Sequence, residues 1–159
     1  MKVKIQLRHE LAQLPKQASE LAGGWDVTCT EIIQESPNYV RCKIGLSIQP
    51  PANTKIMCHA RSSITKTNWF LANGVGLADS DYLGEYEFRF RCLPDTYILE
   101  VPGKTVNHHY CRYEDFPYEV GDRIGQIYLE EVIPMEFEIA DLLEPTTRGE
   151  GGFGSTNIN

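Results

Sequence analysis

The sequence has no hydrophobic run approaching the roughly 20 residues that span a bilayer, so no membrane segment is expected. It has no basic run either, and its formal net charge is −7. Nucleic acid is therefore not an expected partner, because such binding relies on Lys and Arg against phosphates. The start lacks the continuous apolar centre of a signal peptide. We expect a soluble, cytoplasmic protein.

The five cysteines are odd in number and widely scattered, and no CxxC pair occurs. This pattern excludes a disulfide framework and a zinc site, and it is typical of reduced, buried thiols in an intracellular protein. The residues His108 and His109 are of the type that binds metals. Adjacent residues of a strand point to opposite faces, however, which disfavours a shared metal.

Alternation of apolar and polar residues is the main pattern that is present. It runs from Tyr39 to Ile48, from Glu85 to Arg91 and from Ile133 to Ile139, and it also marks residues 1–8. A period of two predicts half-buried strands, and no amphipathic helix is convincing. A chain of 159 residues suits one domain. We predict an all-β sandwich or barrel.

The stretch from Asn73 to Arg91 combines a strand with a glycine-rich corner. Gly74 and Gly76 are followed by the run Asp79-Ser80-Asp81-Tyr82. Glycines at such a corner allow the backbone to pass close to a neighbour. The carboxylates and the phenol could position a water or a sugar; a polar turn with local hydrogen bonds is the alternative.

Two further stretches have residue types that bind phosphates. Arg61, Ser62 and Ser63 offer a cation and two hydroxyls at a helix start, although the segment taken alone favours a capped helical turn with a surface arginine. Near the C-terminus, Thr147–Thr156 places four glycines around Phe153. Its amides, hydroxyls and one arginine could wrap a phosphate chain, whereas a disordered tail is the usual alternative.

With these pieces in order, the sequence resembles the trimeric dUTP pyrophosphatases (dUTPases). Five motifs carry the resemblance: GGWDVTC at 23–29, ARSSITK at 60–66, NGVGLADSDYLGE at 73–85, GDRIGQI at 121–127 and RGEGGFGST at 148–156. The resemblance implies a jelly-roll-like β-sandwich or barrel with little helix. It also implies a β domain over 1–143 and a flexible glycine-rich arm over 144–159 that completes the active site.

The resemblance implies roles for individual residues. Asp79 matches the aspartate that activates the attacking water, and Tyr82 matches the tyrosine that packs against deoxyribose and rejects a 2′-hydroxyl. Asn73 lies where the family reads uracil from a hairpin. The other implied substrate-binding residues are Arg61, Ser62, Ser63, Gly76, Gln126, Arg148, Phe153, Gly154, Ser155 and Thr156. Asp26, which alone reads as a turn cap, matches the residue that holds Mg²⁺ through water.

The implied function is hydrolysis of dUTP to dUMP and pyrophosphate, with attack at the α-phosphorus. This reaction keeps uracil out of DNA and supplies dUMP for thymidylate synthesis. The implied assembly is a homotrimer whose sites are shared between subunits. The segment 91–120 is longer than the family pattern and is a candidate surface for a protein partner. Two alternatives stay open: a dCTP deaminase, which would need a glutamate acid/base, and a regulatory protein that binds dUTP.

Overall fold

The computed structural model describes residues 1–93, 95–101, 104–110 and 115–151, and for 95–101 and 104–110 the backbone alone. Within these ranges the chain forms β-strands and a short 3₁₀ turn, η1, with no α-helix, and no helix there could cross a membrane. The strands are β1 (Lys4–Leu7), β2 (Trp25–Thr28), β3 (Glu31–Ser36), β4 (Tyr39–Lys43), β5 (Leu46–Gln49), β6 (Thr54–Ala60), β7 (Trp69–Leu71), β8 (Gly76–Asp79), β9 (Glu87–Cys92), β10 (Asp95–Val101), β11 (Lys104–Tyr110) and β12 (Arg123–Glu131), and η1 spans Ser62–Lys66.

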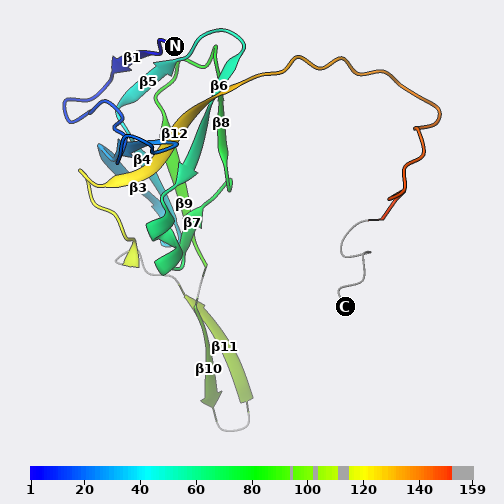
Figure 1. Cartoon of the computed structure of the whole chain (residues 1–159). Helices are drawn as coiled ribbons and strands as arrows, with labels where there is room; N and C mark the ends of the chain where they lie inside the picture. Colours follow the sequence, from blue (N-terminus) through cyan, green and yellow to red (C-terminus); the bar gives the residue numbers. More distant parts are fainter. Residues whose placement is uncertain (94, 102–103, 111–114, 152–159) are drawn as a thin grey trace.

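Two four-stranded antiparallel sheets form the body of the molecule (Figure 1). One has the order β2-β12-β6-β8 and the other β3-β4-β9-β7. The pair β1-β5 lies at one end of the body, and the hairpin β10-β11 projects from the other (Figure 1). The expected all-β architecture is confirmed.

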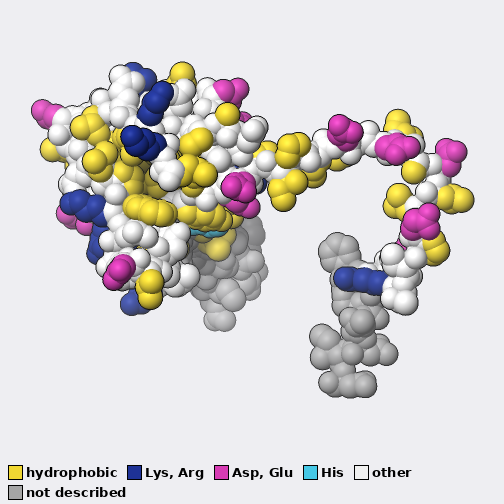
Figure 2. All heavy atoms as spheres, turned by 45° about the horizontal axis from the view of Figure 1, so that its top comes forward, with side chains coloured by type: hydrophobic (Ala, Val, Ile, Leu, Met, Phe, Trp, Pro, Cys, Tyr) yellow, Lys and Arg dark blue, Asp and Glu magenta, His cyan; other side chains and the backbone are white. Residues whose placement is uncertain are grey.

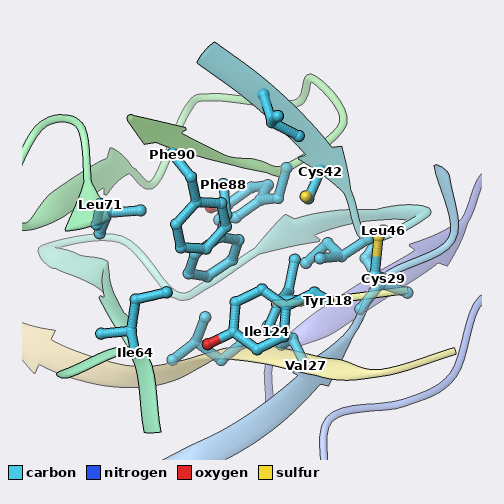
Figure 3. Close-up of a cluster of buried hydrophobic side chains, with 14 of the residues drawn as sticks. Val27, Cys29, Cys42, Leu46, Ile64, Leu71, Phe88, Phe90, Tyr118 and Ile124 are labelled. Atoms are coloured by element: carbon cyan, nitrogen blue, oxygen red, sulfur yellow. The ribbon is translucent and has the colours of Figure 1, made fainter. Parts of the chain in front are cut away.

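The core lies between the two sheets (Figure 3). Phe88 and Phe90 of β9 are its largest fully buried side chains, and Val27 of β2 and Ile124 of β12 come from the opposite sheet. A Cβ added at Gly125 would overlap the Phe88 ring, so glycine is required there for β12 to approach β9. Cys29, Cys42 and Cys58 are free thiols, as predicted.

The prediction of one strand from Tyr39 to Ile48 is wrong in one respect. The stretch forms two strands, β4 and β5, which belong to different sheets. Gly45, between them, has a φ of 66°, a left-handed conformation that ends the extended run. Alternation of apolar residues continues through this break because both strands face the same core, so periodicity alone does not reveal it.

The alternating segment from Ile133 to Ile139 is not a strand in the isolated chain. Residues beyond β12 leave the body in an extended path (Figure 1), and hydrophobic side chains line that path (Figure 2). Ile133, Phe137 and Ile139 are 79%, 89% and 99% exposed. A strand needs a neighbour for its backbone hydrogen bonds, and no other described segment of the chain lies beside this one.

Candidate active site

The turn after β8 creates a pocket of about 250 Å³. Four predicted site residues line it together: Asn73, Gly76, Asp79 and Tyr82. Cys58 of β6 and the core ring of Phe88 form part of its wall. We call this the hairpin pocket. The glycine-rich stretch therefore does more than turn the chain, because it places a carboxylate, an amide and a phenol around one cavity.

Two glycines give the hairpin pocket its shape. A Cβ at Gly76 would lie 3.0 Å from the Cβ of Cys58, so β8 approaches β6 closely only with glycine there. Gly84 lies against the Tyr82 ring, where a Cβ would overlap the phenol. The Tyr82 hydroxyl donates a hydrogen bond to the Glu85 carbonyl oxygen at 3.2 Å. The phenol is thus held at the pocket by its neighbours in sequence.

Burial controls ionisation in the wall of the hairpin pocket. It raises the pKa of the Cys58 thiol to about 11. It also raises the pKa of Tyr86, whose hydroxyl donates to the Ile48 carbonyl oxygen at 3.4 Å. Both groups are neutral near pH 7, so the wall they form adds no negative charge beside Asp79.

A second group of predicted residues surrounds the buried carboxylate of Asp26. Its Oδ1 accepts a hydrogen bond from Gln126 Nε2 at 2.9 Å, and Arg61 Nε lies 3.7 Å from the same oxygen. Its Oδ2 accepts from Arg123 Nη1 at 2.9 Å. We call Asp26, Arg61, Arg123 and Gln126 the carboxylate cluster. It contains two guanidinium groups and one carboxylate, so it is positively charged overall and suits an anionic ligand.

The two serines follow Arg61 at the start of η1. Both are exposed, and Ser62 lines an open cavity of about 510 Å³ together with Gln126. The expected helix start is a five-residue 3₁₀ turn, and no side-chain hydrogen bond caps it. The serine hydroxyls are therefore free of a capping role, and Ser62 shares its cavity with Gln126 of the carboxylate cluster.

The hairpin pocket and the carboxylate cluster lie at different places on one chain. In the β6-β8 pair, Asp79 is opposite Lys55 and Gly76 is opposite Cys58. Arg61 follows Ala60 at the far end of β6. The five residue steps from Lys55 to Ala60 span roughly 17 Å at about 3.3 Å per residue. A nucleotide with its base near Asn73 and its first phosphate near Asp79 would extend away from Arg61 of the same chain.

The chain has relatives among known proteins. No family model matches the chain, but curated relatives do over its whole length. It is 30% identical to a deoxyuridine 5′-triphosphate nucleotidohydrolase of Helicobacter pylori and 36% identical to one of Desulfitobacterium hafniense, over 100% of this chain and 99% and 98% of the relatives. The chain belongs to the dUTPase family. The relative from Yarrowia lipolytica is 32% identical over 100% of this chain and 91% of its own.

Solved dUTPase structures share the fold. The dUTPase of Staphylococcus bacteriophage 80alpha, determined with the compound dUPNHPP, superimposes with a TM-score of 0.77, covering 99% of both chains at 19% identity. The expected dUTPase-type architecture is therefore confirmed. A second phage dUTPase structure, that of phage phi11, is described with a structural Mg(II) ion, and it superimposes with a TM-score of 0.66.

The dUTPase motifs of the C-terminal arm are only partly described. Arg148 belongs to the segment after β12, which leaves the body in an extended path (Figure 1), and its Nε donates to the Gly151 carbonyl oxygen at 2.8 Å. The predicted residues Phe153, Gly154, Ser155 and Thr156 lie outside the described residues. In a single chain, the structure does not bring Arg148 to the hairpin pocket or to the carboxylate cluster.

Two features of the candidate site are not predictable from the sequence. Arg123 stands inside the GDRIGQI motif, but nothing in the motif shows that its side chain turns back to Asp26, 97 residues earlier. Cys58 and Phe88 belong to strands read as core, and their place in the hairpin pocket depends on how β6 and β9 lie against β8. Only the tertiary arrangement reveals either contribution.

The groups around Asp26 can be compared with the ligands that Mg²⁺ prefers. In the described ranges, no group of three or more His, Cys, Asp or Glu side chains lies together. Mg²⁺ usually keeps several waters and uses one or two carboxylates together with substrate phosphates. Asp26 offers the one carboxylate of that mode of binding, and the substrate phosphates would offset the charge of the two arginines beside it, so the ion would arrive with the nucleotide. Asp26 is the residue that would hold it through water.

Proposed function

We propose that this chain hydrolyses dUTP to dUMP and pyrophosphate through attack of water on the α-phosphorus. The observation that carries this proposal is the hairpin pocket, where Asn73, Gly76, Asp79 and Tyr82 line one cavity. Membership of the dUTPase family supports the same reaction. The proposed biological role is to keep uracil out of DNA and to supply dUMP for thymidylate synthesis.

Recognition of the base and sugar takes place in the hairpin pocket. Asn73 and the backbone around Gly76 read the uracil edge, and the close approach of β8 to β6 leaves little room for the methyl group of thymine. The Tyr82 ring packs against the deoxyribose, and a 2′-hydroxyl would collide with it. Steric exclusion and unpaired polar groups are the two means by which such a pocket discriminates among nucleotides.

The chemical step uses Asp79 as general base. The side chain is exposed at the rim of the hairpin pocket, where a water can bind between it and the α-phosphorus. A carboxylate within hydrogen-bond reach of that water orients it and accepts its proton. The bond from the α-phosphorus to the bridging oxygen then breaks, and pyrophosphate leaves. Magnesium, when bound with the nucleotide, neutralises phosphate charge during this step.

The phosphate chain binds to the carboxylate cluster and the serines. Arg61 and Gln126 contact phosphate oxygens, and Ser62 and Ser63 donate from their exposed hydroxyls. Asp79 lies opposite Lys55, roughly 17 Å of strand from Ala60, so a phosphate chain that starts at Asp79 points away from Arg61 of the same chain. We therefore propose a homotrimer in which Asp79 of one subunit faces Arg61 of another.

The exposed segment after β12 supports assembly into the homotrimer. Its side chains Ile133, Phe137 and Ile139 are almost fully exposed, although their alternation is that of a strand with one buried face. Exposed apolar stretches of this size mark sites of association. We propose that this segment packs on a neighbouring subunit and directs the arm over 144–159 to a distant active site. There Arg148 and Ser155 hold the outer phosphates and Phe153 covers the base.

Two further proposals concern the setting of the enzyme. The hairpin β10-β11 projects from the body (Figure 1), and its outer edges pair with no described strand. Such edges accept a strand of another protein, so the 91–120 segment stays a candidate partner surface. We also propose a cytoplasmic location, which the free thiols of Cys29, Cys42 and Cys58 support.

The deaminase alternative is disfavoured by the state of Glu87, the glutamate among the described residues lining the hairpin pocket. Arg41 Nη2 donates to it at 2.7 Å and Arg89 Nε at 2.6 Å. Burial would raise the pKa of Glu87, but these hydrogen bonds outweigh it and hold the pKa below its ordinary value. A glutamate bound in this way is not available as the proton donor that deamination requires.

The testing experiment measures pyrophosphate release from dUTP, dTTP, dCTP and UTP with Mg²⁺. Wild-type protein is expected to act on dUTP alone, and Asp79→Asn is expected to lose at least about a hundredfold in kcat. Asp81→Asn, in the same turn but outside the pocket wall, is the matched control and should retain activity. Ammonia release from dCTP, or dUTP binding without hydrolysis, would refute the proposal.

A further inference from the structure

Arg123 contacts two other members of the carboxylate cluster, one through its side chain and the other through its backbone. Its Nη1 donates to Asp26 Oδ2 at 2.9 Å, and its carbonyl oxygen accepts from Arg61 Nη1 at 3.3 Å. Among the described residues, Arg123 is thus bonded to both the buried carboxylate and the arginine that faces the phosphates. Its own guanidinium is about half exposed, at 53%.

An irregularity in β12 makes the contact with Asp26 possible. Arg123 and Gln126 are three residues apart, and in a regular strand such residues face opposite sides of the sheet. The register between β12 and β2 shifts between Arg123 and Gly125. An irregularity of this kind redirects a side chain, and here both Arg123 and Gln126 reach Asp26.

Asp26 depends on these donors because its side chain is only 3% exposed. Each oxygen has one close hydrogen bond, Oδ1 from Gln126 and Oδ2 from Arg123. A buried carboxylate that loses a partner takes another or is strongly destabilised. Without the Arg123 side chain, the carboxylate would turn toward Arg61 and Gln126 and draw both away from a ligand.

We propose that Arg123 is a positioning residue for the triphosphate. It occupies Asp26 Oδ2, so that Arg61 and Gln126 stay directed at the phosphates. This inference rests on the proposed function of the carboxylate cluster as the phosphate-binding half of the site. Arg123 acts through Asp26 and does not itself bind phosphate.

The first test compares Arg123→Ala and Arg123→Lys with wild type in calorimetric binding of a non-hydrolysable dUTP analogue and of dUMP. The alanine variant is expected to bind the analogue about tenfold more weakly, since Arg61, drawn toward Asp26, loses a charge-assisted hydrogen bond to phosphate, while its affinity for dUMP is unchanged. The lysine variant keeps a cation for Oδ2 and should recover part of the loss. In turnover, KM should rise with little change in kcat. Equal weakening of dUMP and analogue would show a general structural defect and overturn the proposal.

A double-mutant cycle with Asp26→Asn decides how Arg123 acts. If it acts through Asp26, the variant carrying both Arg123→Ala and Asp26→Asn binds the analogue no more weakly than Asp26→Asn alone. Additive losses would mean that Arg123 contacts phosphate directly and would overturn the positioning role. If wild type binds the analogue but releases no pyrophosphate from dUTP, the proposed hydrolysis is refuted instead. The double-mutant cycle measures binding, so it would still decide the role of Arg123.

Discussion

A mixture of two inactive variants should be active if the site is shared between subunits. Asp79→Asn disables the hairpin pocket, and Arg61→Ala disables the carboxylate cluster. Each homotrimer alone should therefore be inactive. Asp79 lies opposite Lys55 near the start of β6, and Arg61 follows its end, roughly 17 Å of strand away, so we expect an active site that uses both to take them from different chains.

The expected recovery follows from counting subunits. In randomly mixed trimers, a site is intact when its hairpin comes from an Arg61→Ala subunit and its arginine from an Asp79→Asn subunit. Each condition holds for about half of the subunits, so about one quarter of the sites are complete. An equimolar mixture, unfolded and refolded together, should release pyrophosphate at about one quarter of the wild-type rate.

The control and the refutation use the same assay. Mixing Asp79→Asn with Tyr82→Ala puts a defect in the hairpin pocket of every subunit, so no site in the mixture is complete. At dUTP concentrations below KM, this mixture should show no recovery of activity. Native mass spectrometry confirms that the mixed trimers exist. If confirmed mixed trimers of the first pair remain inactive, both halves belong to one chain and the shared-site reasoning is wrong.

Three further outcomes are expected. Gly125→Ala should lower the free energy of unfolding by about 1–3 kcal/mol in chemical denaturation, since its Cβ would overlap the Phe88 ring, whereas Gly23→Ala, with open space around it, should have little effect. The Cys58 thiol should be alkylated slowly near neutral pH, with a rate that rises toward its pKa of about 11; fast labelling at pH 7 would contradict this. Glu87→Gln should reduce stability by about 1 kcal/mol at pH 7. The folded-state pKa of Glu87 is lowered from 4.5, so the difference from wild type should vanish as pH falls through that lowered folded-state pKa. A pH-independent difference would contradict this.

Local patterns in the sequence predicted the fold class because strand alternation is a local property. They failed where the chain changes sheet at Gly45, since the core-facing residues continue on both sides of the break. They also indicated a strand from Ile133 to Ile139 that the isolated chain does not form. A strand is completed by its neighbour, and a sequence does not say whether that neighbour belongs to the same molecule.

The candidate site was predictable to the extent that its residues stand in short motifs. Asn73, Gly76, Asp79 and Tyr82 come from one turn, and the structure gathers them in one pocket. The bonds of Asp26 to Arg123 and Gln126 join segments 97 and 100 residues apart. No local pattern encodes them, because they depend on β2 pairing with β12 and on the irregularity in that pairing.

The Phe88 ring has a consequence beyond the core. It forms part of the wall of the hairpin pocket, and it also lies against Gly125, next to Gln126 of the carboxylate cluster. In the proposed trimer, the two regions that this one buried ring touches belong to different active sites. A substitution of Phe88 is therefore expected to alter neighbouring active sites together.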